Sequence, residues 1–247
     1  MRKNLSVILI TLSLSSFSLF SYSNDLNLGV YELNRGEFKA AIAQFTPLVE
    51  DGFAPAQYQM GIIYQNGYGV QRNAQKAFEL FELAAKQHYP EAQFELGIIY
   101  SEGGVVKQDL KKAFELTYKA AIKNLTNAQF NLAVMYANGQ GIKQDDFKAS
   151  RWYKKAANQN NALAQYNLAL LYSEGKGVEK SIEKSYIWNI LAMRNGYKDA
   201  EKSLMIDERS LSELKISNAQ EEANKIYWKI LDQAKLKAKM AQKERLY

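Results

Sequence analysis

A motif that recurs every 36 residues constrains the fold of this chain more than any other feature of its sequence. An alanine-glutamine-aromatic tripeptide begins at positions 56, 92, 128 and 164. In each copy a tyrosine follows eight positions after the alanine, and a glycine follows three positions after the tyrosine. Repeats with a period of about 20 to 50 residues are typical of solenoids, in which stacked units bury a continuous core.

Each copy contains the pattern of two amphipathic helices. In the first copy, the apolar positions 56, 60, 63 and 64 have the spacing of a half-buried helix. Position 61 and its equivalents are always glycine or alanine, and the second helix has alanine at 77, 84 and 85. Small residues at these positions allow neighbouring helices to pack closely. The sequence therefore predicts an all-α fold, an α/α solenoid of helix pairs.

The joints between the helices repeat as well. Each second helix is preceded by a residue suited to capping a helix N-terminus, namely Asn73, Asp109, Asp145 and Ser181. The only histidine, His88, aligns with glycine or asparagine at 52, 124, 160 and 196. Because these residue types favour the left-handed conformation just past a helix end, we interpret His88 as a helix cap and not as a ligand or a base.

A pair of glycines joins the two helices in three copies, as at Gly67 and Gly69, whereas the copy with Gly103 and Gly104 departs from this spacing. Glycine-rich turns can hold phosphate groups. Here no strand precedes the turn, no lysine followed by serine or threonine comes after it, and it recurs with the repeat. We therefore predict a backbone turn that needs positive φ angles.

The motif A-Q-[YF]-x-[ML]-[GA]-x-x-Y-x-x-G, with the glycine turn, the capping residue, a K-A pair and a closing A-A, resembles the Sel1-like repeat family. That family is related to tetratricopeptide repeats. The repeats and the segments that flank them divide the chain into a signal peptide at 1–23, a tetratricopeptide-like opening unit at 24–52, four 36-residue Sel1-like repeats at 53–196, and C-terminal capping helices with a basic tail at 197–247.

Beyond position 196 the period fades, and the sequence predicts one long helix. Ser217 and Gln220 have the spacing of a capping box, and the residues from there to about position 245 favour a helix. The residues placed to cover the apolar face of the last repeat are Ile226, Ile230 and Leu231, with Trp228 near the same stripe. The alternative is that this cap is also a docking helix for a partner.

The N-terminus has the features of a bacterial secretory signal. Arg2 and Lys3 precede an apolar run that extends from Leu5 to Phe20. Small residues follow, and we predict cleavage after Ser23. The mature chain would then be periplasmic or secreted, with no transmembrane segment. The alternative is an N-terminal membrane anchor, although the run of 16 residues is shorter than the roughly 20 needed to span a bilayer.

The positive charge of the chain is concentrated in its tail. The net charge is +6 in total, but residues 225–247 carry +5 and residues 24–224 carry −1. A nucleic-acid site would need basic residues spread along a binding face, so no nucleic-acid partner is predicted. The tail is interpreted as a solvated helix whose lysines complement the helix dipole. The alternative is an envelope contact with anionic lipid, peptidoglycan or an acidic partner.

Residue types that serve catalysis are scarce. The chain has no cysteine and one histidine, so disulfides, thiolate metal sites and cysteine nucleophiles are excluded. We predict no catalytic residue, no metal and no cofactor. The alternative is an exported hydrolase that acts on cell-wall or penicillin-like substrates, as has been proposed for some exported members of the family. Those members have a disulfide in each repeat, which this chain cannot form.

The resemblance implies an adaptor that binds a protein or peptide partner along the concave face formed by the first helices. The polar candidates for contact are Gln59, Glu95, Asn131 and Asn167, and the aromatic candidates are Tyr58, Phe94, Phe130 and Tyr166. Alternatively, the polar residues form a solvated face and the aromatic residues pack between repeats. Gln57 and its three copies are identical, which predicts a structural hydrogen bond between repeats.

Overall fold

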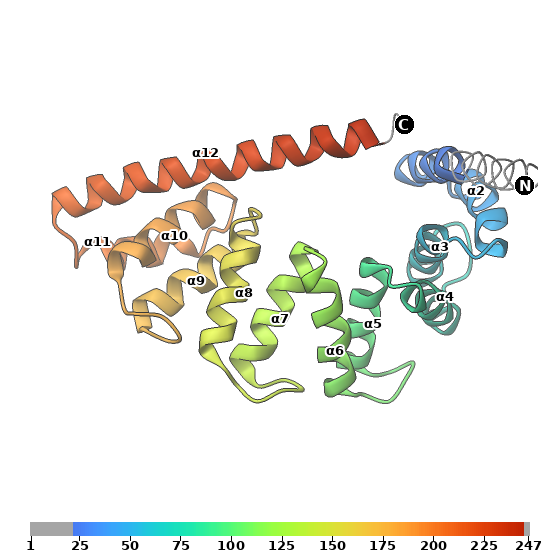
Figure 1. Cartoon of the computed structure of the whole chain (residues 1–247), viewed down its shortest axis with the longest axis horizontal. Helices are drawn as coiled ribbons and strands as arrows, with labels where there is room; N and C mark the ends of the chain where they lie inside the picture. The colour runs from blue at the N-terminus through green and yellow to red at the C-terminus, as the bar shows by residue number, and fades with distance from the viewer. Residues whose placement is uncertain (1–21, 245–247) are drawn as a thin grey trace, which may run out of the picture. The chain divides into compact units, whose positions relative to one another are not determined.

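The computed structural model describes residues 22–244, in which every regular element is a helix (Figure 1). This confirms the all-α prediction. The described residues form two compact units that divide between Ile99 and Tyr100. The sequence periodicity did not reveal this division, because the repeat continues through it without a gap.

Unit 1 begins with a helix over residues 22–34. The helices that follow are α2 (Phe38–Glu50), α3 (Ala54–Asn66), α4 (Ala74–Lys86) and the first part of α5 (Pro90–Glu102). In unit 2, the repeat helices are α6 (Leu110–Ile122), α7 (Thr126–Asn138), α8 (Asp146–Ala157), α9 (Ala162–Glu174) and α10 (Ile182–Arg194). The C-terminal helices are α11 (Ala200–Glu208) and α12 (Glu213–Glu244).

Successive helices pack as pairs, α3 with α4, α7 with α8 and α9 with α10. The small residue in the first helix makes this packing possible. A Cβ atom added to Gly61 would lie 2.5 Å from the ring of Phe81, which is fully buried. The alanines of the second helix, such as Ala77 and Ala84, are buried as well. Close approach of the two helices is therefore confirmed.

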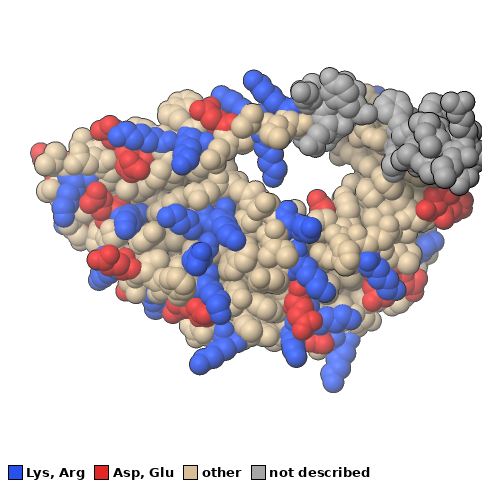
Figure 2. All heavy atoms as spheres, in the orientation of Figure 1, with Lys and Arg blue, Asp and Glu red and all other residues tan. Residues whose placement is uncertain are grey.

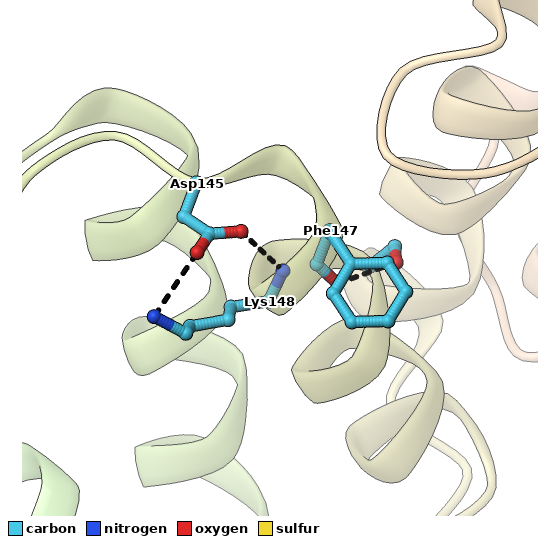
Figure 3. Close-up of polar contacts among 4 residues, drawn as sticks. Asp145, Phe147 and Lys148 are labelled. Atoms are coloured by element: carbon cyan, nitrogen blue, oxygen red, sulfur yellow. Dashed lines mark hydrogen bonds and ion pairs between the residues drawn. The ribbon is translucent and has the colours of Figure 1, made fainter.

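Each predicted N-cap forms its hydrogen bond. The side chain of Asp145 accepts from the backbone N–H of Lys148 at 2.8 Å, and its second oxygen lies 3.0 Å from Lys148 Nζ (Figure 3). The other capping residues accept from the N–H three positions later in the same way, at Asn73, Asp109 and Ser181. These bonds fix where each second helix begins.

The backbone geometry confirms the interpretation of the lone histidine. His88 has φ 63°, Asn124 has φ 65° and Asn160 has φ 67°, all in the left-handed region. The aligned glycines at 52 and 196 have φ 77° and 89°. His88 is thus a helix-ending residue in one of five equivalent joints.

The glycine turns are structural. Gly139 ends α7 with φ 69°, and Gly141 follows with φ 71°. A Cβ atom at Gly141 would overlap the carbonyl oxygen of Leu110, the first residue of α6 in the preceding repeat. In the divergent copy, the positive φ angles fall on Gly103 (79°) and Gly104 (98°), and nothing lies within 4 Å of a Cβ at Gly104.

The repeated glutamines connect neighbouring repeats, as predicted. Gln129 is 1% exposed, and its side-chain nitrogen donates to the carbonyl of Ala121, in the preceding repeat, at 3.2 Å. Its side-chain oxygen accepts from Gln159, at the end of its own repeat, at 2.8 Å. Gln165 makes the equivalent bonds to Ala157 and Asn195, at 3.1 and 2.8 Å. Gln129 and Gln165 therefore each connect their own helix to the end of the preceding repeat and to the end of their own repeat.

The start of the C-terminal helix was predicted wrongly. The helix α12 begins at Glu213 and not at the capping box of Ser217 and Gln220. Ser212 precedes it, and its hydroxyl accepts from the N–H of Lys215 at 3.5 Å. A serine one turn earlier therefore takes the capping position, and Ser217 lies inside the helix.

The apolar stripe of α12 also differs from the prediction at one residue. Helix α12 packs on α10 through the buried residues Ala219, Ala223 and Ile230, with Ile226 and Leu231 half-buried. Trp228 is 58% exposed and lies off this stripe. The reason is geometric, because residues 219, 223, 226 and 230 share one face of a helix and residue 228 does not.

Pro47 lies inside α2, which continues for three residues past it before ending at Glu50. The predicted signal peptide lies outside the described residues, except for Tyr22 and Ser23 in the helix at 22–34. The hydroxyl of Tyr22 donates to Asp51 at 2.8 Å, a contact that cleavage after Ser23 would remove.

Candidate functional site

A groove in unit 1 brings together two of the predicted contact residues. Tyr58 and Gln59 of α3 line this groove, which has a volume of 560 Å³. Ile62, one turn further along α3, lines it as well. The remaining lining residues are Leu33, Asn34, Gly36 and Phe38, from the end of the first helix and the start of α2, together with Tyr68. The groove offers aromatic and aliphatic surface with amide side chains at Asn34 and Gln59.

Aromatic packing fixes two walls of this groove. The rings of Phe38 and Tyr68 stack with their centroids 5.0 Å apart. The ring of Tyr58 lies 5.9 Å from Phe81 in α4 and 5.4 Å from Tyr89. Tyr58 therefore holds the two helices of its repeat together and also presents surface to the groove.

Burial and nearby carboxylates act on the Tyr58 hydroxyl. Burial is the largest cause that raises the pKa of Tyr58, followed by the negative charges of Glu95 and Glu91. Burial also raises the pKa of Tyr89 to about 12. Both phenols are therefore neutral hydrogen-bond donors at physiological pH. Glu95, the polar candidate on α5, is half-buried like its neighbour Phe94, and its charge acts on Tyr58.

In unit 2 the candidates lie on α7 and α9. All four are half-buried, namely Phe130, Asn131, Tyr166 and Asn167. Phe130 packs against Tyr153 with centroids 5.9 Å apart, and Tyr166 packs against Tyr197 at 4.7 Å. The side-chain nitrogen of Asn167 donates to the carbonyl of Leu163 in its own helix at 2.8 Å. The aromatic candidates thus combine partial exposure with packing inside the repeat.

The sequence interpretation placed a lysine in the repeat motif but did not predict its contact with the repeated tyrosine. Lys76 Nζ lies 4.3 Å from the ring centroid of Tyr64 and donates to its hydroxyl at 2.8 Å. Lys112 has the same relation to Tyr100, at 4.0 and 2.6 Å. The signal for this contact is that lysine at 76, 112, 148 and 184 always follows the repeated tyrosine by twelve positions. These cation–π pairs fasten the end of each first helix to the start of the second.

Groups suited to metal-dependent chemistry do not cluster in the part of the chain that the structure describes. No set of three or more histidine, aspartate or glutamate side chains among residues 22–240 could hold a metal ion. Asp145 and Asp146 lie at a helix start, where Asp145 serves as the cap. No helix within residues 22–244 is both long and apolar enough to cross a lipid bilayer.

The sequence model of the Sel1 repeat matches residues 54–89, 90–125, 126–161 and 162–197, which is more than half of the chain. The chain belongs to the Sel1 repeat family. Sel1 repeat proteins are generally scaffolds for protein interactions. No curated protein matches the chain.

Solved Sel1 structures share this fold. A Sel1 repeat protein from Oxalobacter formigenes is 26% identical with a TM-score of 0.67, over 71% of this chain and 72% of that one. The protective antigen c5321 of uropathogenic Escherichia coli strains is 24% identical with a TM-score of 0.56, over 82% of this chain and 51% of that one. A putative Sel1 repeat protein from Klebsiella pneumoniae is 19% identical with a TM-score of 0.50, over 77% of this chain and 95% of that one.

Proposed function

We propose that this Sel1 repeat chain is an exported, non-catalytic adaptor that binds a protein or peptide partner through the polar and aromatic residues on its first helices. The observation that carries the proposal is the groove in unit 1. Two residues predicted as contacts from the repeat alone, Tyr58 and Gln59, line that one groove. A concave surface with aromatic walls and a few amides is typical of peptide-binding sites.

The groove is well placed to recognise a segment without large rearrangement. Its walls are held by the Tyr58–Phe81 and Phe38–Tyr68 ring contacts. Aromatic side chains supply a large contact area at a low cost in conformational entropy. A groove that is rigid before binding loses less free energy on association than a mobile one.

Site-specific photo-crosslinking tests the proposal. A photoreactive amino acid at Gln59 should crosslink to one or a few partner proteins in cells that express the chain. The matched control is the same substitution at Lys86, which is exposed on α4 and lines none of the groove. Identical crosslinking patterns from positions 59 and 86 would contradict this contact surface.

The alternative that the chain is a hydrolase is tested by an activity assay. Incubation of the purified chain with peptidoglycan and with a chromogenic penicillin-like substrate should give no turnover. A saturable hydrolysis that a single substitution abolishes, while the thermal unfolding temperature is unchanged, would replace the adaptor proposal.

Export is a separate part of the proposal and rests on the basic start and the apolar run of the N-terminus. If the chain is cut after Ser23, the mature protein begins at Asn24 and lacks the Tyr22–Asp51 hydrogen bond. N-terminal sequencing of the protein recovered from the periplasm or the medium tests this. An intact N-terminus in the membrane fraction would support the anchor alternative.

A further inference from the structure

A cleft runs beneath the second half of α12 in unit 2. Helix α12 packs on α10 as far as Ile230 and then continues with exposed residues from 232 to 240 (Figure 1). The turn between α6 and α7, with Lys123 and Asn124, faces this stretch together with the turn between α8 and α9, with Asn158 and Gln159. The cleft between the helix and the two turns has a volume of 930 Å³.

A second cleft continues the first along α12. It has a volume of 450 Å³ and shares Asn158, Ile230 and Gln233 with the wider cleft. It leads past Trp188 of α10 to Glu222 near the start of α12. From Glu222 to Ala238 the helix is about 24 Å long, at about 1.5 Å per residue. An extended segment of about seven residues, at about 3.3 Å each, spans the same length.

The charge of the combined cleft is strongly positive. Six lysines line it, namely Lys123, Lys154, Lys155, Lys184, Lys229 and Lys237. Glu222 is the one carboxylate among the lining residues, and it lies in the narrower cleft. Basic side chains concentrated in a concave site raise the local concentration of anionic ligands and their association rate.

The net charge summed over all the repeats does not reveal this basic region. Residues 24–224 carry −1, but residues 103–161 contain ten basic side chains and four acidic ones. Figure 2 shows lysine and arginine predominating over the middle of the visible face, where α6 to α8 lie in Figure 1. The lysines of the tail therefore extend a basic region that the repeats already form at residues 103–161.

The uncharged lining groups suit a peptide. Asn124, Asn158, Gln159 and Gln233 have side-chain amides, which both donate and accept hydrogen bonds and so can pair with a peptide backbone. Ile230, Ala234 and Ala238 form an apolar strip along the helix. Lysine, amide and apolar groups thus lie side by side along one track.

We propose that this cleft binds an acidic, extended segment of a partner protein. Its carboxylates pair with the lysines, its backbone with the amides, and its small apolar side chains with the strip on α12. A lipid surface is a weaker candidate, because a flat bilayer cannot enter the space between α12 and the two turns. None of the lining residues is among the eight candidate contact residues on the first helices, so this site is independent of the groove in unit 1.

Fluorescence anisotropy with a labelled eight-residue peptide of alternating glutamate and alanine tests the cleft. The purified chain should bind this peptide, and it should not bind the same peptide with glutamine in place of glutamate. The triple variant Lys123→Glu, Lys155→Glu, Lys237→Glu should weaken binding by about tenfold or more. The matched control, Lys107→Glu, Lys111→Glu, Lys143→Glu, changes three exposed lysines outside the cleft by the same total charge and should weaken binding less than about twofold.

A truncated chain and a set of Lys→Gln substitutions provide two further tests of the cleft. A chain that ends after Asp232 lacks the exposed wall of the cleft, and should lose peptide binding while its circular-dichroism melting temperature is unchanged. If the glutamate variant does not fold, the three corresponding Lys→Gln substitutions replace it, with the same expected loss. Equal weakening by the cleft and control variants would overturn the proposal in favour of a general charge effect. Binding to phosphatidylglycerol vesicles or peptidoglycan without peptide binding would overturn it as well.

Discussion

The side-chain nitrogen of Gln159 donates a hydrogen bond of 2.8 Å to the side-chain oxygen of Gln129, thirty positions earlier. The same relation joins Asn195 to Gln165 and, in unit 1, Gln87 to Gln57. In each case the bond links the end of a second helix to the buried face of the first helix of that repeat. Because an amide both donates and accepts, it can satisfy a buried carbonyl and a side-chain donor at once. Glutamine recurs at this position for structural reasons.

Gln129→Ala is expected to destabilise unit 2 by about 1 to 3 kcal/mol. The substitution removes a hydrogen bond to the Ala121 carbonyl, which still accepts from the N–H of Asn124, and a second hydrogen bond from the partly buried side chain of Gln159. Each such bond contributes about 0.5 to 1.5 kcal/mol. Urea unfolding followed by circular dichroism measures the change. Gln71→Ala, in an exposed loop, is the control and should change the free energy of unfolding by less than about 0.5 kcal/mol. Equal values for the two variants would show that the hydrogen bonds contribute nothing net.

Gly141→Ala should destabilise the chain more than Gly104→Ala, although both glycines have positive φ angles. At Gly104 the alanine meets open space, so the cost is the left-handed strain alone, about 1 to 2 kcal/mol. At Gly141 the methyl group also overlaps the carbonyl of Leu110, and the total should reach about 2 to 4 kcal/mol.

Thermal unfolding of the two glycine variants, each compared with the unsubstituted chain, checks this order. The contact between Gly141 and Leu110 joins successive repeats, so its loss should also reduce the cooperativity of unfolding. A larger loss of stability for Gly104→Ala would contradict the packing of the turn on α6.

Most of the fold could be predicted from the repeat, because helix starts, helix ends and close helix contacts depend on residue types at fixed positions in the period. The N-caps, the left-handed His88 and the small residue at Gly61 each follow from sequence neighbours and the period. The start of α12 was predicted wrongly because Ser212 and Ser217 are both suitable caps, and local sequence rules do not decide between them. The basic cleft was missed because its lysines come from α8, α10, α12 and the turn after α6, which are far apart in sequence, and only the fold brings them together.

Asp207→Asn should remove a pH dependence of stability. The Asp207 carboxylate is buried and accepts from Ser185 at 2.8 Å and from Asn189 at 3.0 Å, which fastens α11 to α10. Burial raises its pKa above the ordinary 3.8, and the two hydrogen bonds lower it in part. The folded chain therefore binds this proton more readily than the unfolded chain does. The stability from this group is present below pH 3.8 and is lost as the pH rises through the raised pKa.

Urea unfolding of the unsubstituted chain and of Asp207→Asn, at about pH 4 and about pH 7, checks this sign. The unsubstituted chain should lose more stability between the two values than the variant does. The asparagine can also donate a hydrogen bond in a cluster where the side-chain oxygen of Asn189 is buried without a partner. Asp207→Ala, which removes the carboxylate oxygen that accepts from both Ser185 and Asn189, should destabilise the chain at both pH values. The opposite slope, with the unsubstituted chain gaining stability toward neutral pH relative to the variant, would contradict the burial of an unfavourable charge.

Truncation after Lys225 should destabilise the chain and lower its solubility, whereas truncation after Asp232 should leave the stability within about 0.5 kcal/mol. The first cut removes Ile230, which is 4% exposed, and uncovers Trp188 on α10, which is 5% exposed. Loss of a buried isoleucine side chain alone costs about 2 to 5 kcal/mol. The second cut keeps Ile230 and removes residues that are exposed as far as 240.

Thermal unfolding and sedimentation of the two truncated chains separate the cap from the docking alternative. If α12 is a cap, the chain that ends after Lys225 should melt at a lower temperature and aggregate, whereas the chain that ends after Asp232 should not. The reason is that the seven residues between the two cut sites include Ile226 and Ile230. If stability is the same for both truncations while a partner is lost, α12 is a docking element and α10 needs no cover. The 58% exposure of Trp228 makes it the control within that interval, because Trp228→Ala should leave the melting temperature unchanged while Ile230→Ala lowers it. Equal effects of the two substitutions would contradict the assignment of the packed stripe to residues 219, 223 and 230.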